Sequence, residues 1–130
     1  MTSNNILLRA IFLLGFFWIA SCSADKQEVD SRLPGKWQLI EGWRNNRQSP
    51  SLENVFFEFF ADGNMRSNFN FNGSSEAGTF QMEDRILRQR NGEFELEYTI
   101  ESISDSILIL NTILMEAEFR LLLKKEPSAQ

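Results

Sequence analysis

Three glutamates, Glu95, Glu97 and Glu101, recur at intervals of two and four residues in one short stretch, and their pattern could support acid–base chemistry. Residues two apart on a β-strand share a face and lie roughly 7 Å from each other, close to the carboxylate separation of an inverting glycosidase. A row of this kind is usually a solvated strand face, and three arginines from Arg85 to Arg90 precede it. We therefore expect cross-strand ion pairs, each worth under about 1 kcal/mol, and no catalytic carboxylates.

Histidine is absent from the chain, and cysteine occurs once. The first absence removes the commonest general base, the commonest metal ligand and any Ser–His or Cys–His nucleophile pair. A single cysteine can form neither a disulfide within the chain nor a cysteine-based zinc site. Asp62-Gly63-Asn64 lacks the repeated acidic residues of a calcium loop. We expect a protein that is not an enzyme and that holds no cofactor and no metal.

The charge balance bears on the class of partner. The chain has 130 residues, a length that suits one domain, and its net charge is −5. Binding to the phosphate backbone of a nucleic acid depends on clustered Lys and Arg. We therefore expect no nucleic-acid partner.

The one cysteine, Cys22, stands just behind an unbroken apolar run at residues 10–20. A short polar segment with a single positive charge precedes this run, which is the layout of a secretory signal peptide. The run is too short for a comfortable membrane span of about 20 residues. The alternative is an ordinary secretory signal that happens to end near a cysteine.

Ile19-Ala20-Ser21-Cys22 resembles the lipobox of bacterial lipoproteins, an apolar residue and two small ones before the cysteine that becomes the new N-terminus. The resemblance implies a signal peptide at residues 1–21, a diacylglycerol on the Cys22 sulfur and stable membrane anchoring by several acyl chains such as palmitate. Ser23 implies sorting to the outer membrane of a bacterial cell envelope, with the periplasmic and surface faces both open. Residues 22–32 would form a lipidated, flexible tether.

From residue 33 onward, short segments of alternating apolar and polar residues are separated by turn signals. The stretch 55–71 holds six of the twelve phenylalanines around an Asp62-Gly63 turn, which predicts a hairpin with a heavy aromatic face. Such a hairpin needs a sheet that continues on both sides. Residues 111–115 are expected to form a turn. The predicted strands are 36–43, 55–60, 65–72, 77–82, 86–89, 94–100, 107–110 and 117–123.

Eight short strands without an amphipathic helix favour an all-β fold, an eight-stranded antiparallel up-and-down meander barrel. Closure into a barrel also removes both edges of the sheet. A β-sandwich of the same strands is the alternative. We expect the barrel to span residues 33–125 and a C-terminal tail to follow at residues 126–130.

Gly35-Lys36-Trp37, at the start of the first strand, resembles the G-x-W signature of lipocalins, and residues 33–125 resemble the short lipocalin-like domain of bacterial lipoproteins. Phe59 to Gly63 (F-x-x-D-G) and Gly78-Thr79-Phe80 match in order and spacing. The resemblance implies a barrel that Trp37 closes at one end and that opens at the other beneath residues 45–51. It also implies an arginine packed over this tryptophan. Arg120 is the only arginine near the last predicted strand, residues 117–123, but it lies in the middle of that strand.

The sequence leaves two functions open. In the first, aromatic and apolar residues of the barrel interior line a pocket for one small hydrophobic ligand. In the second, the same rings fill the barrel, as side chains can at eight strands, and the protein acts in the cell envelope by contacting a protein partner through outer residues such as Phe56, Phe60, Trp43 and Ile109. The candidate ligand-binding residues are Trp37, Leu39, Phe57, Phe59, Phe69, Phe71, Phe80, Tyr98 and Phe119.

Overall fold

The computed structural model describes residues 30–127 of the chain. The expected signal peptide, the lipidation site Cys22 and most of the expected tether lie outside these residues. Within residues 30–127, no helix is long and apolar enough to cross a membrane.

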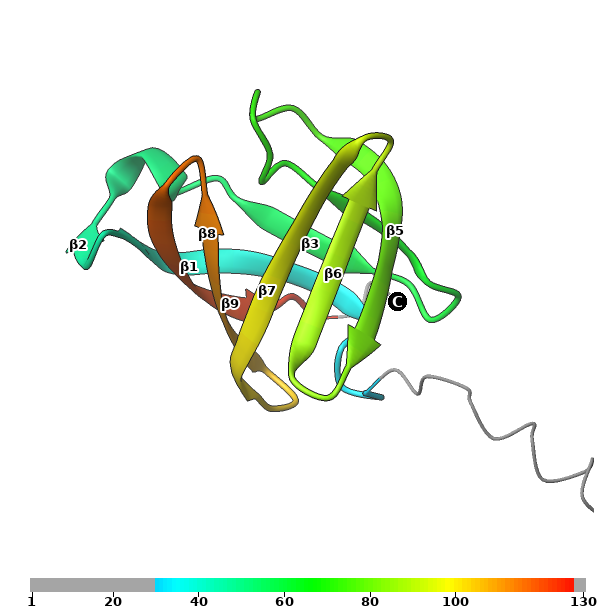
Figure 1. Cartoon of the computed structure of the whole chain (residues 1–130). Coiled ribbons are helices and arrows are strands. Elements are labelled where there is room, and N and C mark those ends of the chain that lie inside the picture. The colour runs from blue at the N-terminus through cyan, green and yellow to red at the C-terminus, as the bar shows by residue number, and fades with distance from the viewer. Residues whose placement is uncertain (1–29, 128–130) are drawn as a thin grey trace, which may run out of the picture.

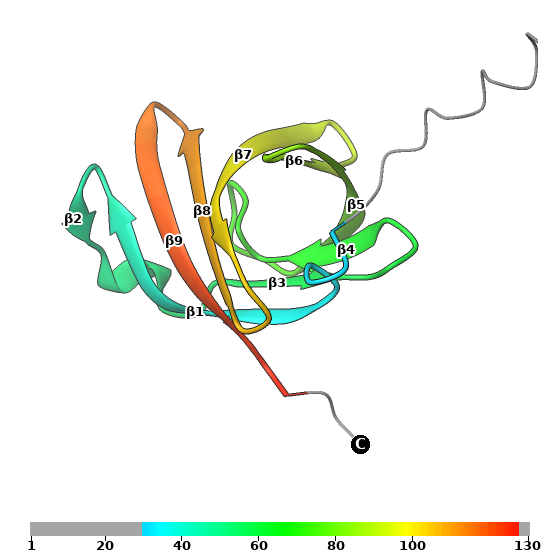
Figure 2. The same cartoon turned by 90° about the horizontal axis from the view of Figure 1, so that it is seen from below.

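A single antiparallel sheet curls round until its last strand, β9, pairs with its first, β1 (Figures 1 and 2). Eight strands form this ring in chain order, while the two-residue β2 pairs with β1 alone. The predicted eight-stranded meander barrel is therefore confirmed, and the β-sandwich alternative is wrong. The elements are β1 (Gly35–Arg44), β2 (Arg47–Gln48), a 3₁₀ helix η2 (Pro50–Leu52), β3 (Phe56–Phe59), β4 (Asn64–Ser67), β5 (Glu76–Glu83), β6 (Ile86–Asn91), β7 (Phe94–Ile103), β8 (Ile107–Leu114) and β9 (Ala117–Lys125).

Consecutive strands run in opposite directions, so the connections alternate between two ends of the barrel. The closed end holds the start of β1 and the turns β3–β4, β5–β6 and β7–β8. The open end holds the β1–β2 hairpin, η2, residues 68–75 and the turns β6–β7 and β8–β9. Both central residues of the β1–β2 turn, Asn45 and Asn46, have positive φ, at 51° and 66°. This left-handed backbone is the one that two-residue hairpins require, and asparagine tolerates it.

Trp37 seals the closed end. Its side chain is fully buried, and its indole Nε1 donates a hydrogen bond of 2.8 Å to the carbonyl oxygen of Leu33. The cation over this ring is Lys125, whose Nζ lies 4.8 Å from the ring centroid. Arg120 lies instead 5.0 Å from the ring of Trp43, on the outer face of the barrel. The end-closing role expected of Trp37 agrees with the structure, whereas the implied arginine over it is replaced by a lysine.

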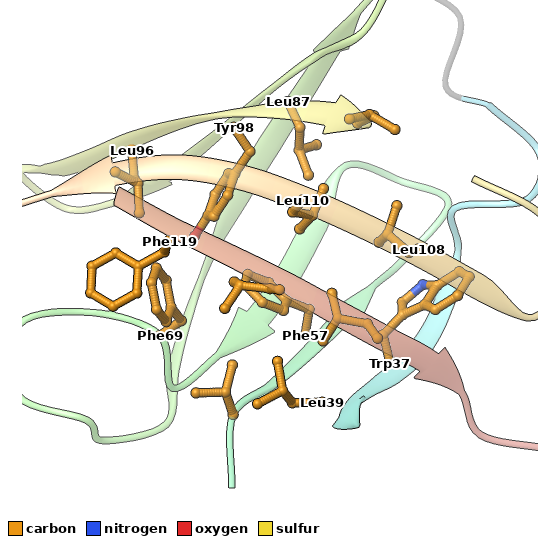
Figure 3. Packing of buried hydrophobic residues seen from close by; sticks show 14 of the residues in the cluster. Trp37, Leu39, Phe57, Phe69, Leu87, Leu96, Tyr98, Leu108, Leu110 and Phe119 are labelled. Atoms are coloured by element: carbon orange, nitrogen blue, oxygen red, sulfur yellow. The ribbon is translucent and has the colours of Figure 1, made fainter. Parts of the chain in front are cut away.

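Aromatic rings fill the middle of the barrel (Figure 3). Phe57 packs edge-on against Tyr98 with 5.6 Å between ring centroids, and Phe59 packs edge-on against Phe80 at 5.0 Å. Phe69 packs edge-on against the Phe119 ring at 5.3 Å. Edge-to-face pairs at these distances are favoured by the ring quadrupoles and add to the apolar burial. The interior is therefore a packed core rather than an open tube.

The strand predicted at residues 65–72 ends at Ser67, and the prediction for its second half is wrong. The Ser67 hydroxyl donates to the Phe56 carbonyl oxygen (2.8 Å) and accepts from the Phe69 backbone N–H (3.0 Å), and these bonds turn the chain out of the sheet. Phe71 consequently leaves the core. Its side chain is 63% exposed and packs edge-on against Phe94 at 4.9 Å. Local hydroxyl-to-backbone bonds compete with the strand ladder here.

The turn predicted at residues 111–115 is also wrong, because β8 continues to Leu114. Its polar residues have partners on β7: the Thr112 hydroxyl donates to the Glu97 carbonyl oxygen (2.7 Å), and the Asn111 amide donates to the Glu101 carboxylate (2.9 Å). The turn lies at Met115 and Glu116, which both have positive φ.

A chain of buried hydrogen bonds crosses β5, β6 and β7. The Tyr98 hydroxyl donates to the Gln89 side chain, whose Nε2 donates to Asn91 Oδ1 (2.9 Å), and Asn91 Nδ2 donates to the Ala77 carbonyl oxygen (3.0 Å). Asn91 fits because Gly78 lies beside it: a Cβ at Gly78 would stand 2.5 Å from Asn91 Nδ2. Among the described side chains, no buried polar atom lacks a hydrogen-bond partner.

Candidate ligand-binding site

The barrel wall is open between β7 and β8 toward the open end. The two strands pair from Ile103 and Leu108 up to Tyr98 and Thr112, where their register stops. Beyond that point residues 94–97 of β7 pair only with β6, and residues 113–114 of β8 pair only with β9. Figures 1 and 2 show β7 and β8 diverging from this point. We call the unpaired interval between residues 94–97 and 113–114 the seam.

A half-open cavity of about 600 Å³ lies at the seam. Its lining combines residues of the outer barrel face with residues of the core that the parting strands uncover. The lining residues are Trp43, Asn46, Glu95, Leu96, Glu97, Thr99, Asn111, Thr112, Ile113, Glu118, Phe119 and Arg120.

Three inward-facing residues, Leu96, Thr112 and Phe119, form the floor of the cavity. Each retains between 7% and 9% of its surface exposed, whereas Phe57 and Tyr98 in the middle of the barrel are fully buried. Figure 3 shows Leu96 and Phe119 at one end of the core cluster, beside Phe69, with Trp37 at the opposite end. The cavity therefore touches the edge of the core and does not enter its centre.

One wall of the cavity is built around Arg120. The guanidinium donates two hydrogen bonds to the Glu101 carboxylate, at 3.0 and 2.8 Å, and stacks over the Trp43 ring. The Asn111 amide donates a third bond to the same carboxylate. These hydrogen bonds, from Arg120 first and Asn111 second, lower the pKa of Glu101 to about 2. The pKa of Arg120 is raised by the same partner. This wall is polar, and the charges of Arg120 and Glu101 neutralise each other.

The opposite wall is the outer face of β7, with Glu95 and Glu97. Arg88 Nε lies 3.0 Å from a Glu97 oxygen, and Arg90 Nε lies 3.6 Å from a Glu95 oxygen. The cross-strand ion pairs expected for these two arginines are confirmed. Arg85 forms no such pair among the described residues and instead donates to the backbone carbonyl oxygen of Glu101. Exposed pairs like these contribute little stability, so the glutamates chiefly set the charge of the wall.

The rim of the cavity is held by the β1–β2 hairpin. The Asn45 backbone N–H donates to the Glu118 carbonyl oxygen (2.7 Å), and the Glu118 N–H donates to Asn45 Oδ1 (2.9 Å). These two bonds fix the backbone at Asn46 and Glu118, which both line the cavity. Ile113, 66% exposed, supplies an apolar surface on the same rim.

Of the nine ligand-binding candidates predicted from the sequence, Phe119 is the one that lines this cavity. Seven others, Trp37, Leu39, Phe57, Phe59, Phe69, Phe80 and Tyr98, are buried in the core, and Phe71 is exposed outside it. Sequence reasoning did not assign Trp43, Thr112, Glu118 or Arg120 to a pocket. The separation of β7 and β8 has no local sequence signal, because it depends on how two strands meet in space.

Among residues 30–127, no group of three or more acidic, histidine or cysteine side chains is arranged to hold a metal ion.

Comparison with known proteins supports the fold. No protein-family model matches the sequence, and no curated protein matches it. The solved structures include a match to the crystal structure of a lipocalin-like protein from Bacteroides uniformis ATCC 8492, with a TM-score of 0.57 and 18% identity. The match covers 73% of this chain and 99% of that chain. Similarity at this level of identity concerns the fold alone, and on that ground residues 30–127 form a lipocalin-like barrel.

Proposed function

We propose that this protein is a lipid-anchored binding protein of the cell envelope that holds one small hydrophobic ligand without chemically changing it. The observation that carries the proposal is the half-open cavity of about 600 Å³ at the seam, with its apolar floor of Leu96 and Phe119. Ligand pockets in proteins commonly measure about 300–1,000 Å³ and combine apolar walls with a few polar groups. The volume and lining of the seam cavity agree with that description.

The proposed site differs from the one expected in a lipocalin-like barrel. The centre of this barrel is occupied by Phe57, Phe59 and Tyr98, each at most 1% exposed, so it has no room for a ligand. The seam gives access from the side of the barrel, and a ligand there covers Leu96 and Phe119 without displacing the core.

Anchoring through Cys22 is part of the proposal and rests on the lipobox-like sequence. The described chain begins at the closed end, where Arg32 Nη1 donates to the Ile103 carbonyl oxygen (3.0 Å) and Lys125 Nζ donates to the Arg32 carbonyl oxygen (2.7 Å). The first described residues therefore lie at the end of the barrel away from the seam. An anchored barrel would therefore keep its cavity accessible.

A cavity-filling variant tests the binding site. Thr99 is exposed on the outer face of β7 and lines the cavity, so Thr99→Trp should fill it without disturbing the core. We expect this variant to bind a hydrophobic fluorescent probe such as 1-anilinonaphthalene-8-sulfonate or N-phenyl-1-naphthylamine at least tenfold more weakly than the wild type does. Thr79→Trp is the matched control, because Thr79 is exposed on β5 and lies outside the cavity lining. Equal probe binding by the wild type and both variants would refute the seam as the site.

A mass measurement tests the anchor. Protein expressed with its full N-terminus in a Gram-negative host should lose residues 1–21 and gain the mass of diacylglycerol and one acyl chain on Cys22. The Cys22→Ser variant should carry no lipid and keep the mass of the unprocessed chain. An unmodified Cys22 in the wild-type protein would contradict lipidation.

A second function, contact with an envelope protein, is favoured by one observation. Three large apolar side chains at the open end are more than 60% exposed: Phe71, Ile113 and Met115. Exposed apolar residues that gather at one end of a molecule are typical of protein contacts. Crosslinking in the native host tests this function by comparing the wild type with a Phe71→Ser, Met115→Ser double variant. A protein that is crosslinked to the wild type and not to the variant would support contact with a partner.

A further inference from the structure

We infer that the ligand of the seam cavity is an amphiphile with a cationic head group. The inference rests on the proposed function and adds the charge of the ligand to it. The cavity lining contains three carboxylates, on Glu95, Glu97 and Glu118, against one guanidinium, on Arg120. Charge complementarity between a site and its ligand governs which partners are rejected as well as which are bound.

The single cation of the lining, Arg120, is already paired with a carboxylate. Glu101 accepts two of the five N–H donors of Arg120, one from Nε and one from Nη2, and the guanidinium carbon lies 5.0 Å from the Trp43 ring centroid. A carboxylate head group at the remaining N–H groups would meet a charge that Glu101 already neutralises through a two-pronged ion pair, which is the stronger geometry for arginine and carboxylate. An acidic amphiphile therefore finds no free positive charge in the lining.

The carboxylates of the cavity are neutralised less completely. Glu95 and Glu97 each meet an arginine of β6 through one close contact, and their side chains remain 67% and 59% exposed. Neither of those two arginines is in the cavity lining. Glu118 has no ion-pair partner among the described residues and stands on the rim. Counting the ion-pair partners, five carboxylates meet three guanidinium groups, and Glu118 is the carboxylate without an ion pair among the described residues.

Arg44 is the other arginine near the floor. Its guanidinium carbon lies 6.0 Å from the Phe119 ring, but Arg44 does not line the cavity. Its charge is on an exposed side chain and is screened by water and salt. Because the Arg44 guanidinium lies beside the ring of the floor residue Phe119, we assign the cationic group to Glu118 rather than to a deeper position in the cavity.

The geometry assigns a position in the cavity to each part of the ligand, the apolar portion and the cationic head group. Leu96 and Phe119 on the floor offer the surface that an alkyl chain or ring would cover, and Ile113 extends this surface to the rim. The backbone of Glu118 is held by two hydrogen bonds with Asn45, and its exposed side chain belongs to the cavity lining, where the chain of a ligand would emerge into solvent. An ammonium or quaternary amine at that position pairs with Glu118 while its apolar portion stays against the floor.

Three probes of equal chain length test the charge preference: dodecylamine, dodecanol and dodecanoic acid, each below its micelle concentration, in titration calorimetry with the full domain. We expect the amine to bind about tenfold more tightly than the acid, with the alcohol between them, and the preference to shrink as salt rises. Glu118→Gln should weaken the amine about threefold and leave the alcohol unchanged. Glu53→Gln, an exposed glutamate outside the cavity lining, should change neither.

The outcomes separate this inference from the proposed function. If the acid binds as tightly as the amine, or if Glu118→Gln leaves the amine's advantage intact, the cationic head group is refuted while hydrophobic binding stands. If none of the three chains binds, the proposed function fails and the inference fails with it. Since Glu118 is an exposed surface residue, its glutamine variant should fold, and its thermal unfolding can be compared directly with that of Glu53→Gln.

Discussion

Lys125 and Trp37 lie directly opposite each other on β9 and β1, and the lysine Nζ lies 4.8 Å from the centroid of the buried indole. The same ammonium donates a 2.7 Å hydrogen bond to the Arg32 carbonyl oxygen. One side chain thus covers the ring that closes the barrel and fastens the incoming chain. The closed end is held by this contact together with the indole's own bond to Leu33.

Replacing Lys125 should therefore loosen the closed end. We expect Lys125→Ala to lower the free energy of unfolding by about 1–2 kcal/mol, through loss of a cation–π contact and one hydrogen bond. Lys124→Ala is the control, because Lys124 is the exposed neighbour on the same strand and should change stability by no more than about 0.5 kcal/mol. Urea unfolding followed by tryptophan fluorescence measures both. Equal effects of the two variants would show that the contact contributes nothing.

Gly78 should tolerate no side chain. A Cβ at this position would lie 2.3 Å from the Arg90 carbonyl oxygen, which is backbone and cannot move without disturbing the pairing of β5 and β6. We expect Gly78→Ala to cost about 3 kcal/mol or more, as overpacking against fixed atoms does. Gly73→Ala is the comparison. The φ of Gly73, +72°, is unfavourable for alanine, but a Cβ at this position would meet nothing within 4 Å. A cost of about 1 kcal/mol there, measured by chemical denaturation, would separate steric from conformational strain.

Tyr98 is the only tyrosine of the chain, so its ionisation can be followed directly by absorbance near 295 nm. Burial raises the pKa of its phenol well above the ordinary value. The unfolded chain then loses this proton at a lower pH than the folded one, and stability falls as pH rises above about 10. We expect the phenolate signal to appear together with the loss of the native circular dichroism spectrum. Ionisation near pH 10 in a protein that is still folded would contradict this burial.

The carboxyl group of Glu101 should lose its proton at an unusually low pH. Its pKa in the folded protein is held at about 2 by hydrogen bonds from Arg120 and Asn111, so it stabilises the fold above the ordinary carboxyl pKa and loses this contribution as pH falls toward 2. Because both partners are about 40% exposed, we expect a contribution of no more than about 1 kcal/mol. Arg120→Met should return the Glu101 pKa toward its ordinary value in a carboxyl NMR titration. Arg66→Met, an exposed arginine on β4, should leave it unchanged.

The resemblance to lipocalins implied the closing tryptophan and an arginine over it, whereas the alternation of inward and outward residues along β9 explains why the cation is Lys125. Leu121 and Leu123 point into the barrel, so Lys125, two residues on, points the same way at the end of β9. Arg120 has the opposite parity and meets Trp43 outside. This alternation is visible in the sequence, and applying it to Lys125 would have found the contact. The end of β4 at Ser67 was harder to foresee, because a polar side chain replaces the strand ladder there.

The resemblance of Gly35-Lys36-Trp37 to the lipocalin signature implied the closing tryptophan. The sequence by itself determined the class of fold and the number of strands in the ring. Those features follow from local patterns, namely the two-residue period of the strands and the turn residues between them. Only the tertiary structure decided that the rings fill the barrel and that β7 and β8 part at Tyr98 and Thr112 to leave a cavity in the wall. Both features depend on how side chains from strands far apart in the sequence pack into the same interior, and no single stretch of the sequence encodes this packing.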